Sequence, residues 1–354
     1  LEVAEQYPKI KTDELLVDTA AYWMVKDPTR FDMILTTNLY GDILSDMADD
    51  FELQYGSQQT PFQNRHPLHV NHYNQATAYW MDNWTMANLL NTGIVSSTTG
   101  LPVSYRSVED PRLPYYIFRQ VPDDAGGAVA TCQGGGCPIG LLGEGYLGRD
   151  AGDPSAFSNE GALIATFGVY PVGGMVDMDA PKTLEASDGT GEGIFPMLTT
   201  YMVKFLHAEM ALTTSVSGDP ADLLEEAIRL SMDKVADYGA DKYPAVAGSA
   251  KEITGSKVDE YVSDVMAAYA AAASEDERLN IIMTEYQLAL WGNGIEAYNN
   301  FRRTGFPNYD VTAPVMGNPP YPLRFIIPVS ELETNPQLSD YQPDPFAAIF
   351  WDVN

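Results

Sequence analysis

The sequence of 354 residues predicts a mainly α-helical protein with long irregular loops. Three observations support this fold class. Segments with helix-capping signals and apolar helical spacing follow one another from residue 196 to residue 303. Glycine is concentrated between residues 120 and 195, where irregular loop is expected. Patterns typical of strands are scarce after residue 50.

The first 48 residues differ in character from the rest. Residues 11–26 are compatible with a helix, and the apolar run 31–37 predicts a short buried strand. A turn at residues 38–42 leads into a helix that carries Asp42 and Asp46. Carboxylates four residues apart lie on one face of a helix, so this pair could be presented to one divalent cation.

The next region is predicted to be a loop followed by a helix. Residues 50–75 are rich in glutamine, asparagine, histidine and proline, which favours a loop. Residues 75–91 predict a helix in which Trp80 and Trp84 lie four residues apart. That spacing places both rings on one helix face, so core packing is favoured for them.

The C-terminal half predicts consecutive helices. Residues 197–212 are apolar, which is typical of a buried helix. Asp219 and Pro220 supply an N-cap and a proline at the first helical position, and residues 223–231 carry the inner apolar stripe. A further helix is expected over residues 258–272.

The last predicted helix contains the most informative stretch of the chain. Ser274 and Glu277 have the spacing of a capping box, in which each side chain accepts a hydrogen bond from the other residue's backbone N–H. Residues 285–307 read E-Y-Q-L-A-L-W-G-N-G-I-E-A-Y-N-N-F-R-R-T-G-F-P and predict a helix that buries one aromatic face. Gly305, two residues before Pro307, is expected to end it.

Composition argues against several classes of partner. The formal net charge is -29, from 49 acidic and 20 basic residues. Such a field repels phosphate backbones and anionic lipids, so binding to nucleic acid or to an anionic membrane is not expected. A hydrophobic fraction of 45% favours a packed core over disorder.

Cys132 and Cys137 flank the segment Q-G-G-G, whose glycines allow the chain to fold back. In an oxidising compartment the two cysteines are expected to form a disulfide, and two free thiols are the alternative. A zinc site would need two more ligands, which no nearby cysteine or histidine supplies.

Three of the four histidines recur every third residue at His66, His69 and His72, which suggests a metal site. However, Pro67 argues against a regular helix, and a strand would place His66 and His69 on opposite faces. A polar loop is therefore favoured over a metal centre.

Aromatic residues make up 11% of the chain and suggest a ligand-binding surface. Aromatic faces stack on the C–H faces of sugars, and neighbouring amides can bind hydroxyl groups. Core packing is the alternative for any of these rings. Tyr73, Tyr79 and the loop residue Tyr105 are the ligand-binding candidates. No Gly-x-Ser-x-Gly, phosphate-binding loop or His-Glu-x-x-His motif is present, and no catalytic residue is predicted.

Two C-terminal motifs together carry a family resemblance. E-x-x-x-x-L-W-x-x-G-x-E-A-Y-x-x-x-R-R-T-G-x-P at residues 285–307 is followed by P-x-R-F-x-x-P-x-S-E-x-x-x-N-P at residues 322–336. The motifs D-P-R-L-P at residues 110–114 and G-R-D-A-G-D-P at residues 148–154 fit the same pattern. Over about residues 50–354 the chain resembles the SusD/RagB family of outer-membrane nutrient-binding lipoproteins.

The SusD/RagB resemblance implies a helical binding protein and not an enzyme. It implies capture of nutrients, usually oligo- or polysaccharides, for a partner TonB-dependent (SusC-like) transporter, and it implies no cofactor. It also implies the extracellular face of the cell outer membrane, with a lipid anchor in the full-length protein. The family's N-terminal half, built of tetratricopeptide-like helix pairs, has no counterpart in this sequence, and no repeat of ~34 residues replaces it.

Residues 1–48 carry a second resemblance. The pattern L-V-D-T-A-A…V-x-D-P-x-x-F-D-x-I-L-T-T-N-L-Y-G-D-I-L-S-D is similar to the metal-binding segment of the isocitrate/isopropylmalate dehydrogenase family. That resemblance implies that Asp18, Asp42 and Asp46 would hold a magnesium or manganese ion.

The alternative function is thus a fragment of a metal- and NAD-dependent hydroxyacid dehydrogenase. The catalytic residues and the adenine-binding loop of that family have no match in this sequence, which favours the binding function. We expect a dehydrogenase-like segment at 1–49 and a SusD-like domain at 50–354.

Overall fold

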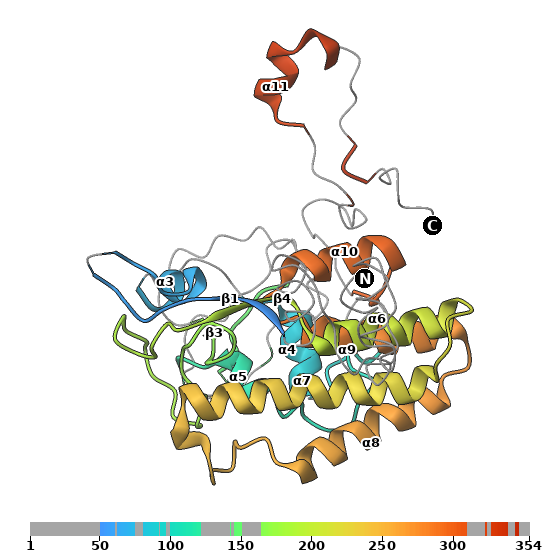
Figure 1. Ribbon diagram of the computed structural model, residues 1–354, viewed down its shortest axis with the longest axis horizontal. Coiled ribbons are helices and arrows are strands. Elements are labelled where there is room, and N and C mark those ends of the chain that lie inside the picture. Colours follow the sequence, from blue (N-terminus) through green and yellow to red (C-terminus); the bar gives the residue numbers. More distant parts are fainter. Residues whose placement is uncertain are drawn as a thin grey trace, which may run out of the picture.

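The computed structural model describes residues 50–60, 62–74, 81–91, 93–96, 100–121, 142, 145–150, 164–309, 323, 327–338 and 344–346. Within these residues helices predominate and strands are few and short, as the sequence predicts (Figure 1). The elements in chain order are β1 (Phe51–Gln54), α3 (Pro67–Asn74), α4 (Asn83–Leu90), α5 (Leu113–Tyr116), β2 (Ile117–Phe118), β3 (Thr166–Phe167), β4 (Ile194–Leu198), α6 (Thr200–Thr213), α7 (Pro220–Lys242), η3 (Pro244–Val246), α8 (Gly255–Ala271), α9 (Glu275–Ala289), α10 (Gly294–Thr304), α11 (Val329–Thr334) and η4 (Pro336–Leu338).

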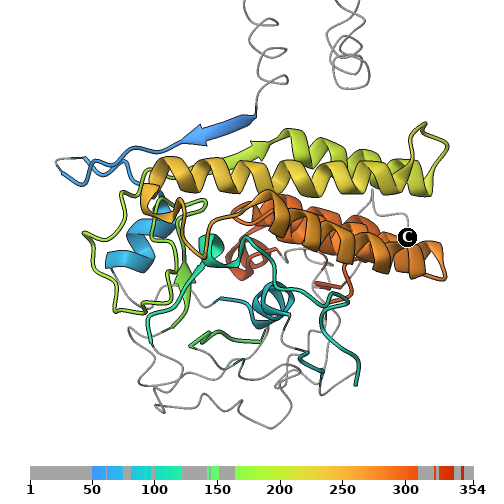
Figure 2. The ribbon, with the colours of Figure 1, turned by 90° about the horizontal axis from the view of Figure 1, so that it is seen from below.

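Helices α6, α7, α8 and α9 pack together as the main body of the described structure. α6 contacts α7 and α9, and α7 contacts α8. Figure 2 shows the α6–α7 pair lying against the α8–α9 pair. Their facing sides form one hydrophobic cluster, in which Phe205, Ile228, Val265 and Ile282 are fully buried. Burying an aliphatic or phenyl side chain contributes about 1.5–3 kcal/mol, so this cluster is a major source of stability.

Residues 50–75 contain regular structure where a loop was predicted. β1 pairs antiparallel with β4, with Leu53 opposite Phe195. That pairing also removes residues 197 and 198 from the helix predicted there, and α6 begins at Thr200 instead. α3 begins at Pro67, where a proline is compatible with a helix because the first N–H groups have no intrahelical acceptor. The loop prediction was wrong because composition does not report a partner strand distant in the sequence.

Residues 285–307 form two helices, α9 and α10, and not the single helix predicted. Between them Gly292 has φ +96°, and a Cβ at this position would lie 2.4 Å from Cγ of Pro171. The side chain of Asn293 then caps α10 by accepting a hydrogen bond from the backbone N–H of Glu296 at 3.1 Å. The predicted end is confirmed, because Gly305 closes α10 in the left-handed conformation.

The D-P-R-L-P motif and the start of the 285–307 stretch meet in a buried ion-pair network. Asp110 accepts hydrogen bonds from Arg112 Nε at 2.9 Å and Arg112 Nη2 at 2.7 Å. Glu285 accepts from Arg106 Nη1 at 2.6 Å and from the Tyr261 hydroxyl at 2.8 Å. Both arginines and both carboxylates have fully buried side chains, so their charges cancel within the core. Burial alone would raise the pKa of Asp110, but the Arg112 guanidinium lowers it below its usual value.

The three regularly spaced histidines are buried on or beside α3, and not in a polar loop. His69 Nε2 donates to the carbonyl oxygen of Asp188 at 3.0 Å, and its ring stacks on Tyr73 at a centroid distance of 4.3 Å. Burial lowers the pKa of His66, His69 and His72 to about 4, so they are neutral core residues at neutral pH. Among the described residues, no group of three or more metal-binding side chains could hold an ion.

Candidate functional site

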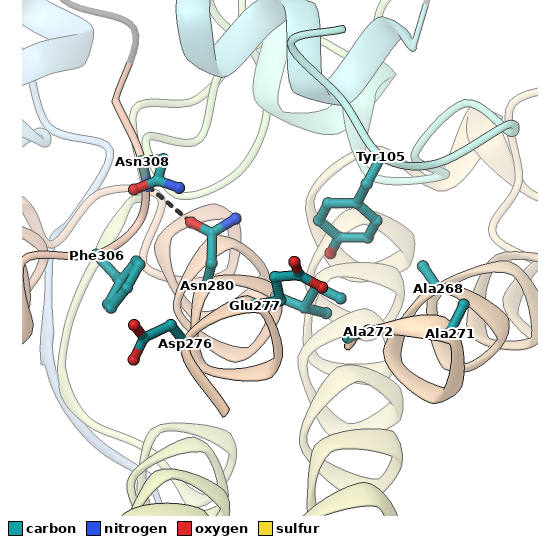
Figure 3. A pocket seen from close by; sticks show the side chains of 10 residues that line it. Tyr105, Ala268, Ala271, Ala272, Asp276, Glu277, Asn280, Phe306 and Asn308 are labelled. Atoms are coloured by element: carbon teal, nitrogen blue, oxygen red, sulfur yellow. Dashed lines mark hydrogen bonds between the residues drawn. The ribbon is translucent and has the colours of Figure 1, made fainter. Parts of the chain in front are cut away.

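A groove beside the N-terminal end of α9 is the candidate ligand site (Figure 3). Its volume is about 440 Å³, within the range of small-molecule sites. Its walls come from the loop between α4 and α5, the C-terminal end of α8, the first turns of α9 and the segment after α10. The lining residues are Tyr105, Ala268, Ala271, Ala272, Asp276, Glu277, Asn280, Ile281, Phe306 and Asn308.

Tyr105 is held in the groove wall through its hydroxyl group. The hydroxyl donates to Glu285 Oε1 at 2.5 Å, which connects the ring to the buried ion-pair network. Burial raises the pKa of Tyr105 well above its usual value, and the negative charge of Glu285 raises it further. The hydroxyl therefore keeps its proton and remains a donor. Because the ring is only partly buried, this anchoring presents it to the groove in a fixed orientation.

The N-cap predicted at Ser274 is confirmed, but Glu277 returns its bond to Ala273 and not to Ser274; Glu277 and Asp276 place two carboxyl groups at the groove. The Ser274 hydroxyl accepts from the backbone N–H of Glu277 at 3.1 Å, and Glu277 Oε2 accepts from the backbone N–H of Ala273 at 2.7 Å. Asp276 lies between the two cap residues in the sequence and is exposed. Figure 3 shows Glu277 on the side of Tyr105 and Asp276 on the side of Phe306.

The segment that follows α10 forms the wall opposite Tyr105. Asn280 Oδ1 on α9 accepts a hydrogen bond from the backbone N–H of Asn308 at 2.7 Å, which ties the segment to α9. Phe306, two residues earlier, contributes a partly buried ring. The groove therefore combines two aromatic side chains with amide and carboxyl groups.

Tyr105 is the predicted ligand-binding residue that lies at the groove. Tyr73 is only 2% exposed. Its hydroxyl donates to the Phe167 carbonyl at 2.9 Å and accepts from the Met175 N–H at 3.0 Å. Its ring therefore packs in the core and offers no free face for a sugar. Trp84 is buried, as the sequence predicts.

The other predicted site residues lie outside the described part of the chain: Tyr79, the cysteines Cys132 and Cys137, and the aspartates Asp18, Asp42 and Asp46.

Phe306, Asp276 and Asn308 were not predicted from the sequence as site residues. The capping box could have placed Asp276 at an exposed helix start. The meeting of Tyr105 with Phe306 could not have been predicted, because about two hundred residues separate them and no local pattern reports that contact.

Two family models match different parts of the chain. Residues 190–319 match the model described as SusD and RagB outer membrane lipoprotein. Residues 1–52 match the isocitrate/isopropylmalate dehydrogenase model. Both resemblances stated from the sequence are confirmed over these residues.

Solved structures of SusD homologues share the fold. One from Bacteroides fragilis gives a TM-score of 0.52 at 16% identity, covering 91% of this chain and 61% of the homologue. A second from the same organism gives 0.50 at 15% identity, covering 90% and 60%. At these identities the likeness concerns the fold alone, and the chain covers less than two thirds of either structure.

Curated 3-isopropylmalate dehydrogenases match the first residues of the chain. The 3-isopropylmalate dehydrogenase of Archaeoglobus fulgidus is 51% identical over 47 residues, 13% of this chain and 14% of the enzyme. That of Streptomyces coelicolor is 53% identical over 47 residues, with the same coverage. The chain therefore spans about one seventh of the length of these enzymes.

The helices of the described residues were compared with the length and hydropathy that a membrane span requires, and none of them meets both.

Proposed function

We propose that this chain binds a soluble oligo- or polysaccharide as a nutrient and does not convert it. The site of binding is the groove between Tyr105 and Phe306. Delivery is to a partner TonB-dependent transporter, with the chain at the extracellular face of the cell outer membrane. The match of residues 190–319 to an outer-membrane lipoprotein family and the SusD-like fold support this nutrient-binding role.

The observation that carries the proposal is the pairing of two aromatic rings across one groove. Tyr105 and Phe306 come from distant parts of the chain and line the same cavity. Sugars have apolar C–H faces that stack on such rings, and hydroxyl groups that need hydrogen-bond partners. Asn280, Asn308 and Asp276 supply amide and carboxyl groups beside the rings. Geometry of this kind binds a ligand without any chemical step.

The expected contribution of each ring is modest. Stacking of a nucleic-acid base on an aromatic side chain is worth ~1–3 kcal/mol, and we expect a sugar to gain no more. Because ~1.4 kcal/mol corresponds to a factor of ten in affinity, Tyr105→Ala or Phe306→Ala should weaken binding by about tenfold or less. Tyr105→Phe keeps the ring and should retain most of the affinity.

A glycan array followed by calorimetry tests this function. The array identifies a ligand, and calorimetry compares the wild type with Tyr105→Ala, Tyr105→Phe and Phe306→Ala. Phe62→Ala is the matched control, because Phe62 is 80% exposed and does not line the groove. The proposal fails if no glycan binds, or if Tyr105→Ala and Phe306→Ala both bind as tightly as the Phe62 variant.

A further inference from the structure

We infer that the groove selects among saccharides by charge, accepting neutral and amino sugars and disfavouring sugars that carry carboxylate or sulfate groups. This inference rests on the proposed glycan-binding function and specifies the class of ligand. It follows from the charges that line and surround the groove.

The ionisable groups of opposite charge are unevenly distributed at the groove. Asp276 and Glu277 both line it and are both exposed, whereas its ten lining residues include no lysine, arginine or histidine. The carboxyl group of Glu277 accepts a hydrogen bond from a neutral backbone N–H, which orients the carboxylate without neutralising it. A ligand in this groove therefore lies beside two carboxyl groups and no lining basic side chain.

The nearest basic residue in the sequence, Arg278, is held beside the C-terminal end of α8, next to the groove wall. Its Nη2 donates to the carbonyl oxygen of Ala272 at 3.4 Å, and its guanidinium carbon lies 6.0 Å from the centroid of the Tyr269 ring. It does not line the groove. It therefore reduces the negative potential at the groove, but it supplies no basic side chain among the lining residues.

The helix dipole of α9 is the other source of positive potential. A helix N-terminus carries roughly half a positive charge, and N-terminal N–H groups often bind anions. Here the Ser274 hydroxyl already accepts a hydrogen bond from the Glu277 N–H. The first turn also holds three acidic residues, Glu275, Asp276 and Glu277. Three carboxyl groups outweigh half a charge, so the end of α9 repels anions. The chain's net charge of -29 acts in the same direction.

The negative charge at the groove should give a measurable difference in affinity between neutral and anionic saccharides. Two unit charges about 4 Å apart in water interact strongly enough to change an affinity by about fivefold. The preference should shrink as salt is added, because the Debye length falls from ~30 Å at 0.01 M to ~8 Å at 0.15 M ionic strength. Amino sugars, which carry a positive charge, should show the opposite dependence and bind most tightly at low salt.

A titration with three classes of hexasaccharide tests the inference. The probes are N-acetylglucosamine hexamer (neutral), glucosamine hexamer (cationic) and galacturonic acid hexamer (anionic), beside array glycans of the same three classes. We expect anionic ligands to bind about fivefold or more weakly than neutral ones at low salt, and Asp276→Asn or Glu277→Gln to reduce the difference. Glutamine keeps the capping geometry, so Glu277→Gln should fold normally.

Glu333→Gln is the matched control for net charge, because Glu333 is exposed on α11 and lies outside the groove. It should leave the selectivity unchanged. The inference is overturned if anionic and neutral glycans bind equally, or if Glu333→Gln alters selectivity as much as the groove variants do. If no glycan of any class binds, the proposed function itself fails, which is a different result from equal binding.

Discussion

Replacing Glu285 with glutamine should destabilise the protein more than any exposed charge substitution. Glu285 has no exposed surface, and it accepts hydrogen bonds from Tyr105, Arg106 and Tyr261. Arg112 Nη2 lies 3.7 Å from its second carboxyl oxygen. Glu285→Gln keeps the shape of the side chain and removes its charge. The network is then left with two buried guanidinium groups and one carboxylate.

The expected loss of stability is large because Glu285→Gln leaves one buried guanidinium charge without a carboxylate. Removing one partner of a buried ion pair typically costs about 3–5 kcal/mol. Glutamine also places an NH₂ group where Glu285 now has an acceptor oxygen, so one of the donors around it loses its partner. We therefore predict a loss of about 3–5 kcal/mol in the free energy of unfolding, a large share of the 5–15 kcal/mol typical of folded proteins.

Urea unfolding followed by the helical circular dichroism signal measures this cost. The matched control is Glu225→Gln, because Glu225 and its partner Arg229 have 42% and 37% of their side-chain surfaces exposed. An exposed ion pair contributes about 0–1 kcal/mol, so the control should be nearly neutral. If Glu285→Gln lowers the unfolding free energy by no more than the control does, the buried ion-pair network does not contribute the stability that its burial predicts.

Three further predictions concern titration, redox state and catalysis. The pKa of His66, His69 and His72 is about 4 in the folded protein and 6.5 when unperturbed, so the unfolded chain binds more protons between these values. Their stabilising contribution, about 3 kcal/mol for each histidine, should be complete above pH 6.5 and lost as the pH falls toward 4; unfolding free energies that do not change over that interval would contradict this. Cys132 and Cys137 should be disulfide-bonded, and finding two free thiols by titrating the denatured, unreduced protein would refute the bond. No NAD-dependent oxidation of isocitrate or isopropylmalate should occur with magnesium or manganese, and turnover that is lost in Asp42→Asn would overturn the binding function.

The sequence predicts well those features that depend on local signals. The Asp219 cap with Pro220, the Ser274 N-cap and the end of α10 at Gly305 all lie where predicted. Each depends on hydrogen bonds or backbone conformations within a few residues, which composition and spacing report directly. The helical fold class follows from these same segments.

The features that the sequence did not predict depend on distant contacts. β1 requires β4, about 140 residues later, and the break at Gly292 reflects the close approach of Pro171. The sequence makes Tyr73 a plausible stacking residue for a sugar. In the structure its ring stacks on His69 and its hydroxyl accepts from the Met175 backbone N–H. Tyr105 was correctly placed in a loop, but its partner ring Phe306 depends on how that loop meets the segment after α10. The division into residues 1–49 and 50–354 stays a prediction, and peptide mapping across residues 40–60 would test whether the two parts form one polypeptide.

A crystal structure with a bound oligosaccharide tests the central claim most directly. The ligand would be the one that binds most tightly on the glycan array. The account predicts a sugar ring within about 4 Å of the face of Tyr105 or Phe306, with hydroxyl groups bonded to Asn280, Asn308 or Asp276. A sugar bound elsewhere on the chain, with the groove free of ligand, would contradict the assignment of the site.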